Sequence, residues 1–320
     1  MHLVTGGTGF IGCYVVKELL ARGRSVVSYD LGLGPTIVDM ILTEEEQRQV
    51  KWVSGDITDG FNLINVSKAN SVRKVIHLAS WQIPAANANP ARAVQIICAG
   101  TVNVLEAARI LDLERVVWAS SIAVFGPEEA YGQPAEKGLP NDARHMPTSV
   151  YGASKSYCEF LANYYHNAFG VDSLGFRFSA VYGVGRLVGR SAFTTSMIEA
   201  AALGKPYAVP FADDSVDWQY VEDVARLVVH AAEAPMPKAL AFNTRGDVRP
   251  VTDGVRYLER LAPDARFTLE GGKFGICWKV DTSVLEAELG FQPEHTLEKG
   301  ILKTFNQFRR MHGLPETEGL

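Results

Sequence analysis

The segment Tyr-Gly-Ala-Ser-Lys contains Tyr151 and Lys155, two residues whose types and spacing suit acid–base catalysis. Residues four apart lie on one face of a helix, one turn above each other. Free tyrosine titrates near pH ~10, and a fixed ammonium group beside it favours the phenolate and lowers the pKa of the phenol. The pair therefore suits acid–base chemistry at the oxygen of an alcohol or ketone. The alternative is an ordinary exposed helix face, because chance can also supply this spacing.

Two serines, Ser120 and Ser121, follow an apolar run at residues 115–119. If this run is a parallel strand, its carboxyl end faces the crevice in which doubly wound sheets bind ligands. A serine hydroxyl there can hydrogen-bond a substrate oxygen and orient it toward a tyrosine. The alternative is a serine that satisfies backbone groups of the loop.

Short apolar runs alternate with helical segments through the first half of the chain, which is typical of a parallel sheet covered by helices on both faces. Thr43 and Glu46 have the spacing of a capping box and predict a short extra helix. Gly23 is the expected residue just past the first helix. The expected strands are at residues 2–5, 25–29, 51–54, 74–78, 115–119 and 173–178, and the expected helices at residues 10–22, 61–69, 91–111, 150–169 and 296–311. The sequence predicts an α/β fold with a Rossmann-type, doubly wound parallel sheet and a smaller C-terminal substrate-binding region.

The turn after the first expected strand reads Thr-Gly-Gly-Thr-Gly-Phe-Ile-Gly over residues 5–12. It follows a strand and opens a helix, as a dinucleotide-binding fingerprint requires. Glycine permits the tight turn and lets the backbone approach a pyrophosphate. The helix N-terminus then offers N–H groups and a positive dipole to the phosphates. The residues expected to do this are Gly6, Gly9, Phe10, Ile11 and Gly12.

Asp30 ends the second expected strand and predicts which dinucleotide is bound. A carboxylate at this point accepts the hydroxyls of the adenosine ribose and repels a 2′-phosphate. No Lys or Arg stands between Arg24 and Arg48 to hold such a phosphate. We therefore expect NAD rather than NADP; the alternative for Asp30 is a turn-forming residue.

Residues after the third and fourth strands extend the expected cofactor site. Asp56 could meet the adenine amino group and Ile57 its ring, while Ala79 and Ser80 place small side chains beside the cofactor. His77, on an apolar strand, is expected to be a hydrogen-bonded core histidine and not a catalyst.

These motifs resemble those of the extended short-chain dehydrogenases/reductases, in the branch called the NAD-dependent epimerase/dehydratase family. The resemblance spans nearly the whole chain in family order, through TGGTGFIG (5–12), Asp30, GDI (55–57), HLAS (77–80), SSIAVFG (120–126), YGASK (151–155), VYG (181–183), YVEDVA (220–225), LGFQP (289–293) and TLEKG (296–300). It implies that Tyr151 is the general acid or base, and that Lys155 lowers the pKa of Tyr151 and holds the nicotinamide ribose. It also implies that Ser121 is the catalytic serine and Ser120 its neighbour.

The resemblance further implies hydride transfer between substrate and nicotinamide, and a homodimer formed through the helices at residues 91–111 and 150–169. The residues expected to contact NAD are Gly6, Gly9, Phe10, Ile11, Gly12, Asp30, Asp56, Ile57, Leu78, Ala79, Ser80, Ala119, Tyr151, Lys155, Phe178, Ala180 and Val181.

Three positions depart from the members of the family that act on nucleotide sugars. An asparagine of those members is Ala180 here, an arginine on the diphosphate is Val216, and a further asparagine is Ile97. These apolar replacements argue against a nucleotide sugar, because a pyrophosphate favours bidentate arginine. Arg186 and Arg190 could compensate, or they could be solvated loop residues.

Substrate recognition is expected from the loop after the sixth strand and from the C-terminal region. The expected substrate contacts are Trp81, Ser121, Ser179, Arg186 and Trp218. Phe178, Phe274 and Trp278 could complete a small apolar pocket, the alternative for each aromatic being ordinary core. We expect residues 1–178, with about 212–245 returning, to form the NAD-binding domain, and about 179–211 and 246–320 to form the substrate-binding region.

The composition of the 320-residue chain is that of an ordinary globular protein, with a formal net charge of −5. This charge, without a basic block, argues against nucleic acid or an anionic membrane as partner. The four scattered cysteines, Cys13, Cys98, Cys158 and Cys277, are expected to be reduced core thiols and not a disulfide or metal framework. With no leader and no apolar run of membrane-spanning length expected, the predicted location is cytoplasmic.

Three hypotheses for function follow. The first is an NAD-dependent oxidoreductase that acts on a secondary alcohol or ketone of a sugar or other small polyol. The second is a nucleotide-sugar epimerase or dehydratase without net turnover of NAD. The third is a cofactor-sensing regulator, against which Ser121, Tyr151 and Lys155 count, since a sensor needs no reactive phenol.

Overall fold

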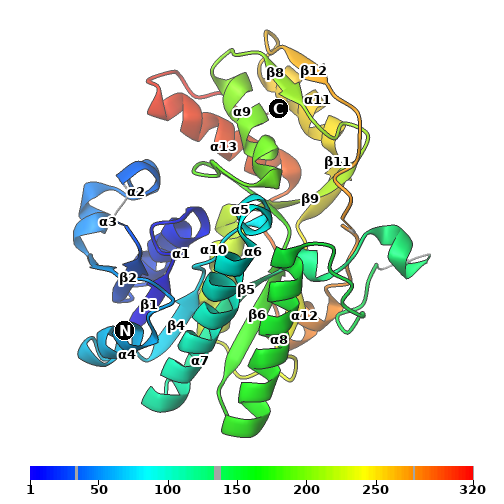
Figure 1. Cartoon of the computed structure of the whole chain (residues 1–320). Helices are drawn as coiled ribbons and strands as arrows, with labels where there is room; N and C mark the ends of the chain where they lie inside the picture. Colours follow the sequence, from blue (N-terminus) through cyan, green and yellow to red (C-terminus); the bar gives the residue numbers. More distant parts are fainter. Residues whose placement is uncertain (33–34, 133–137, 277, 320) are drawn as a thin grey trace.

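A seven-stranded sheet forms the centre of the molecule (Figure 1), in a computed structural model that describes residues 1–32, 35–132, 138–276 and 278–319. The strand order is β10-β6-β5-β4-β1-β2-β3, with every neighbouring pair parallel. The strands are β1 (His2–Thr5), β2 (Val26–Asp30), β3 (Val50–Ser54), β4 (Lys74–His77), β5 (Arg115–Ser121), β6 (Ser173–Phe178) and β10 (Ala241–Asn243). From β1 the next strands are added toward one edge of the sheet, and from β4 they are added toward the other edge. Doubly wound sheets bind ligands at this switch point between β1 and β4. The predicted Rossmann-type fold is confirmed.

Helices cover both faces of this sheet because its strands are apolar on both sides. Leu3 packs into one core and its neighbour Val4 into the other, and Val75 and Ile76 divide in the same way. Helices α1 (Phe10–Ala21) and α10 (Val221–Glu233) lie together on the Val4 side. Helices α4 (Gly60–Ala69), α7 (Gly100–Leu111) and α8 (Val150–Phe169) cover the Leu3 side.

Capping residues explain where several helices begin and end. Gly23 follows α1 with φ +67°, a left-handed conformation that favours glycine. Thr43 and Glu46 form the predicted capping box of α3 (Glu44–Arg48). The Ser149 side chain accepts from the backbone N–H of Gly152 at the start of α8, the helix that carries Tyr151 and Lys155.

The helix predicted over residues 91–111 contains an irregular turn. It comprises α6 (Pro90–Val94), a π-helical turn at Gln95–Ala99, and α7. The Thr101 hydroxyl donates to the carbonyl of Ile97 at 2.7 Å, and such side-chain bonds compete with the regular backbone ladder. The continuous segment Pro90–Leu111 is long and apolar enough to cross a membrane, but half of its most apolar window is buried inside the protein, as in a core helix of any globular fold.

A smaller region lies over one end of the large sheet (Figure 1). It contains a three-stranded sheet of β11 (Asp247–Pro250), β9 (Ser215–Tyr220) and β7 (Ala180–Tyr182), and a two-stranded sheet of β12 (Phe267–Leu269) and β8 (Tyr207–Val209). The remaining helices are α2 (Pro35–Ile41), α5 (Ile83–Ala88), α9 (Phe193–Ala202), α11 (Val251–Leu261), α12 (Ser283–Leu289) and α13 (Leu297–Met311). Between β9 and β11 the chain returns to the large sheet as β10, which extends it beyond the six predicted strands.

Candidate active site

A groove of about 270 Å³ lies at the carboxyl ends of the strands of the large sheet. The glycine turn after β1 forms part of its wall. The expected cofactor contacts that line it are Gly6, Gly9, Phe10, Ile11, Gly12, Asp30, Asp56, Ile57, Leu78, Ala79, Ser80 and Ala119. The remaining expected contacts, Tyr151, Lys155, Phe178, Ala180 and Val181, line an adjoining cavity. Residues far apart in the sequence therefore meet around these two adjoining spaces.

The glycine turn has the shape of a phosphate cradle. Gly6 has φ +72°, and a Cβ built on it would lie 2.7 Å from the backbone nitrogen of Ala79. A Cβ on Gly12 would lie 2.0 Å from the Gly6 carbonyl oxygen, so helix and turn approach more closely than any side chain permits. Helix α1 has no side-chain cap and no acidic residue in its first turn. Its positive end is thus open to an anion, and the turn fits the pyrophosphate of a dinucleotide.

Asp30 lies at the end of β2 beside this turn. Its Oδ2 accepts from the backbone N–H of Thr8 at 3.2 Å and from the Thr8 hydroxyl at 2.6 Å, and its Oδ1 accepts from the N–H of Leu31 at 2.8 Å. A carboxylate offers about four acceptor positions and three are used here, so about one remains, on Oδ1, for a ribose hydroxyl. Asp30 therefore supports the turn in addition to the role expected from the sequence.

Asp56 also lines the groove and is held by Arg92, whose Nη2 donates to Oδ2 at 3.0 Å. Although partial burial alone would raise the pKa of Asp56, hydrogen bonds from Thr58 and Arg92 hold it below its usual range. Tyr29 lines the groove as well and was not predicted. Its ring fills the space above Gly55, where a Cβ would lie 2.2 Å from the ring. A tyrosine in an apolar strand gave no signal of this position.

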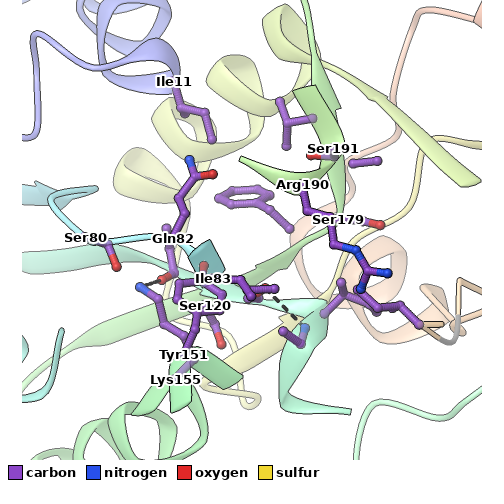
Figure 2. A pocket seen from close by; sticks show the side chains of 18 of the residues that line it. Ile11, Ser80, Gln82, Ile83, Ser120, Tyr151, Lys155, Ser179, Arg190 and Ser191 are labelled. Carbon is purple, nitrogen blue, oxygen red and sulfur yellow. Dashed lines mark hydrogen bonds between the residues drawn. The ribbon is translucent and has the colours of Figure 1, made fainter. Parts of the chain in front are cut away.

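Tyr151 and Lys155 point from α8 into the adjoining cavity (Figure 2). Lys155 is only 2% exposed, and its Nζ donates to the carbonyl oxygen of Ala119 at 2.6 Å. The same Nζ lies 5.7 Å from the centroid of the Tyr151 ring. The backbone of β5 thus fixes the ammonium group next to the phenol.

The two serines that end β5 have different partners. The Ser120 hydroxyl donates to Oε1 of Glu159 at 2.6 Å, and Arg177 holds both oxygens of that carboxylate at 2.9 and 2.7 Å. The Ser121 hydroxyl accepts from the N–H of Ala123 at 3.2 Å, and its own proton is left to donate. This arrangement favours Ser121 over Ser120 as the hydroxyl that meets a substrate.

The cavity around Tyr151 has a volume of about 150 Å³. The expected residues that line it, besides those named for the cofactor, are Trp81, Ser121, Ser179, Arg186, Arg190, Phe274 and Trp278. The sequence did not single out Gln82, Ile83, Ser191 and Ile276, which also line it. Figure 2 shows Ser179, Arg190 and Ser191 across the cavity from Tyr151 and Lys155.

Trp218 is not part of this cavity, which corrects the expectation that it contacts the substrate. It is 1% exposed on β9, the middle strand of the three-stranded sheet. Its indole N–H donates to the carbonyl of Arg249 at 3.2 Å, and its ring packs edge-on against Tyr182. The middle position in the sheet places Trp218 in the core. Ile97 and Val216 are buried in the core too, whereas Ala180 lines the cavity.

His77 is a core residue, as predicted. Its ring nitrogens lie 2.8 Å from the Thr5 hydroxyl and 3.3 Å from the Thr101 hydroxyl. Burial lowers the pKa of His77 to about 3, so the ring is neutral at physiological pH. Three cysteines, Cys13, Cys98 and Cys158, are buried free thiols; Cys277 lies outside the described residues.

Comparison with known proteins agrees with this geometry. Residues 2–243 match the model of the NAD dependent epimerase/dehydratase family. The chain is 28% identical over 318 residues to a UDP-glucuronate 4-epimerase of Thermodesulfobacterium geofontis, covering 95% of each protein. Among solved structures, L-threonine 3-dehydrogenase from Trypanosoma brucei superposes with a TM-score of 0.87 at 22% identity, covering 98% of both chains. The Thermus thermophilus UDP-glucose 4-epimerase complex with NAD gives a TM-score of 0.79 at 24% identity, covering 96% of this chain and 98% of the other.

Proposed function

The chain belongs to the NAD dependent epimerase/dehydratase family and uses NAD, and we propose that it is a dehydrogenase that oxidises a secondary alcohol of a sugar or other small polyol, or reduces the ketone. The observation that carries this proposal is the cavity of about 150 Å³ around Tyr151. It lies directly beside the cofactor groove, and residues such as Ala119 and Ser80 line both.

The cofactor would be held by the glycine turn at its pyrophosphate, by Asp30 at its adenosine ribose and by Lys155 at its nicotinamide ribose. Bound there, NAD supplies the acceptor for a hydride. An ammonium group has three donors, and the bond to Ala119 uses one of them. Its other two N–H groups can donate to the hydroxyls of the nicotinamide ribose, while its charge lies near the Tyr151 phenol.

Tyr151 performs the proton transfer in this proposal. Its phenolate takes the proton of the substrate hydroxyl while the adjacent C–H bond breaks and the hydride leaves, so that C–O becomes C=O. The Ser121 hydroxyl donates to the substrate oxygen and holds it toward Tyr151. The buried Lys155 ammonium stabilises the phenolate before the proton arrives. The reverse sequence reduces a ketone.

A second candidate is a nucleotide-sugar epimerase or dehydratase, which the name of the 28% identical relative supports. Net dehydrogenation is favoured because two contacts expected for a nucleotide sugar are missing. The Ala180 side chain cannot form a hydrogen bond in the cavity, and the Val216 side chain is buried away from the cavity. Fold likeness does not choose between the two, since dehydrogenases and epimerases share this architecture.

Net formation of NADH separates the two candidates. The purified protein with NAD is offered sugars, small polyols and UDP-glucose, and absorbance at 340 nm is followed together with product analysis. A dehydrogenase accumulates NADH in proportion to ketone. Conversion of the nucleotide sugar without accumulation of NADH would show the second candidate to be right.

We also propose that the protein is a homodimer that pairs through α8. Tyr157, Phe160 and Tyr164 lie along one face of this helix and are 49%, 64% and 53% exposed. Such a stripe is more apolar than a solvated helix face requires. Light scattering should give twice the chain mass of 34.9 kDa, and Phe160→Glu should give the monomer. A monomeric wild-type protein would refute the proposal.

A cytoplasmic location is proposed on the basis of the buried free thiols of Cys13, Cys98 and Cys158. Fractionation of cells that express the protein at native level tests it, and recovery outside the cytoplasm would contradict it.

A further inference from the structure

Three cationic side chains line the cavity beside Tyr151. Lys155, Arg186 and Arg190 contribute positive charge, and no Asp or Glu is among the described residues that line it. The chain as a whole carries a formal net charge of −5. Three like charges around one small cavity repel one another unless an anion lies between them. The charge of the cavity therefore indicates an anionic ligand.

Arg186 is the cation best placed for such a ligand. Its Nη2 donates to the Ser191 hydroxyl at 2.9 Å, and within the described ranges it forms no ion pair with a carboxylate. Its Nε is buried and has no hydrogen-bond partner there. Burial lowers the pKa of Arg186 to about 10, and the nearby Tyr151 acts in the opposite direction. A desolvated guanidinium without an anion is costly, so this group is held ready for a ligand.

Trp278 supplies a second unused donor. Its side chain is 6% exposed and lines the cavity, and its indole nitrogen is buried without a partner among the described residues. Buried polar groups are nearly always hydrogen-bonded, so two unpaired buried donors on residues that line one cavity favour a polar group bound beside them. Serine hydroxyls and the Gln82 amide surround the same space.

The size of the cavity limits the ligand. By the same measure the groove that takes a dinucleotide has about 270 Å³ and this cavity about 150 Å³. A nucleotide sugar carries a nucleoside, two phosphates and a hexose, which makes it nearly as large as the dinucleotide. A short-chain acid fits the smaller volume, and its carboxylate matches a guanidinium in geometry.

We propose that the substrate is a small polyhydroxylated carboxylate, with Arg186 and the Trp278 indole as the receptor for its carboxylate. This inference rests on the proposed dehydrogenase function and adds the substrate class to it. Hydroxyls of the acid would meet the serines, and the hydroxyl to be oxidised would meet Tyr151. Arg190 adds positive charge at the rim, where its guanidinium stacks 4.3 Å from the centroid of Phe274.

The pyrophosphate of NAD is the other anion within reach, because Arg186 also borders the cofactor groove and lies 5.8 Å from the Phe10 ring centroid. The partner that orients Arg186 favours the substrate, since Ser191 lines the substrate cavity and not the groove. The pyrophosphate has its own site at the N-terminus of α1.

The experiment compares acids with neutral alcohols of equal length: glycerate with glycerol, erythronate and threonate with erythritol, and gluconate with sorbitol. NADH formation gives kcat and KM, and quenching of tryptophan fluorescence gives the Kd for NADH. The variants are Arg186→Gln, Arg186→Lys and Trp278→Phe. Arg266→Gln is the matched control, because Arg266 is exposed, outside the cavity lining and loses the same charge.

We expect turnover with at least one acid and at least tenfold lower kcat/KM with its neutral partner. Arg186→Gln should raise KM for the acid roughly 10- to 100-fold, with Arg186→Lys intermediate and Trp278→Phe raising it several-fold. The Kd for NADH should stay within about twofold in every variant, and Arg266→Gln should match wild type.

Equal use of acids and neutral polyols, with KM unchanged in Arg186→Gln, would overturn the inference and leave the proposed dehydrogenase function standing. A tenfold weaker Kd for NADH in Arg186→Gln, with KM for the acid unchanged, would assign this arginine to the cofactor and overturn the inference as well. Interconversion of UDP-glucose without NADH would overturn the proposed function itself.

Discussion

Gly12→Ala should displace the backbone of the cofactor cradle. The added Cβ would lie 2.0 Å from the Gly6 carbonyl oxygen and 2.8 Å from the Gly7 Cα, whereas real Cβ atoms essentially never come closer than 3.0 Å. Both contacts are backbone, so no side chain can turn away. The turn must move by about 1 Å, and a misplacement of this size costs on the order of 100-fold in a positioned site. We expect the Kd for NAD to rise roughly 10- to 100-fold.

Two other glycines make this a graded test. A Cβ on Gly9 would lie 3.2 Å from the Gly6 oxygen, which requires a shift of a few tenths of an ångström. A Cβ on Gly32 would meet nothing within 4 Å. Fluorescence titration with NADH should therefore rank Gly12→Ala well above Gly9→Ala, with Gly32→Ala equal to wild type. Wild-type affinity for NADH in Gly12→Ala, with unchanged unfolding in urea, would show that the close approach of α1 to the Gly6 turn does not control cofactor binding.

Three further predictions concern charges. Asp30→Asn should shift the ratio of NADP to NAD affinity at least about tenfold toward NADP, because the repulsion of a 2′-phosphate is lost; fluorescence titration with both cofactors measures it, and an unchanged ratio would contradict the role of Asp30. Glu159→Ala should lower the free energy of unfolding by about 3–5 kcal/mol, because it leaves Arg177 buried and unpaired; the exposed Glu44→Ala should cost less than about 1 kcal/mol in the same urea titration, and equal costs would refute this. Burial lowers the pKa of His77 to about 3 in the folded protein, so the contribution of the neutral ring to the free energy of unfolding is complete above pH ~6.5 and is lost as the pH falls. Between pH 7 and pH 5 the free energy of unfolding of the wild type should therefore fall by roughly 2 kcal/mol relative to that of His77→Gln. A difference between the two proteins that does not change with pH would contradict this prediction.

The elements that position the chemistry follow local rules, which is why the sequence predicted them. The glycine turn, the capping box at Thr43 and the span of α8 depend on neighbouring residues alone. Apolar runs with strand length gave the six strands of the parallel sheet. The seventh, β10, was missed because three residues bounded by loops carry too little pattern.

The cavity beside Tyr151 was predicted less completely, since its lining depends on packing between distant segments. The sequence offers no sign that distinguishes Trp218 from Trp278 as a pocket residue. In the structure Trp218 lies in the middle strand of a sheet, whereas Trp278 borders the cavity. Likewise, nothing near Ser191 or Gln82 marks them as neighbours of Tyr151. The absence of Asp and Glu among the described residues that line the cavity beside Tyr151 is a property of the assembled cavity and of no single segment.

Turnover by Tyr151→Phe tests the acid–base role proposed for Tyr151. With the best substrate found, we expect kcat to fall by roughly 100- to 10,000-fold, while the Kd for NADH and the unfolding midpoint in urea stay at wild-type values. Near-normal turnover in Tyr151→Phe would contradict the assignment of acid–base chemistry to this residue.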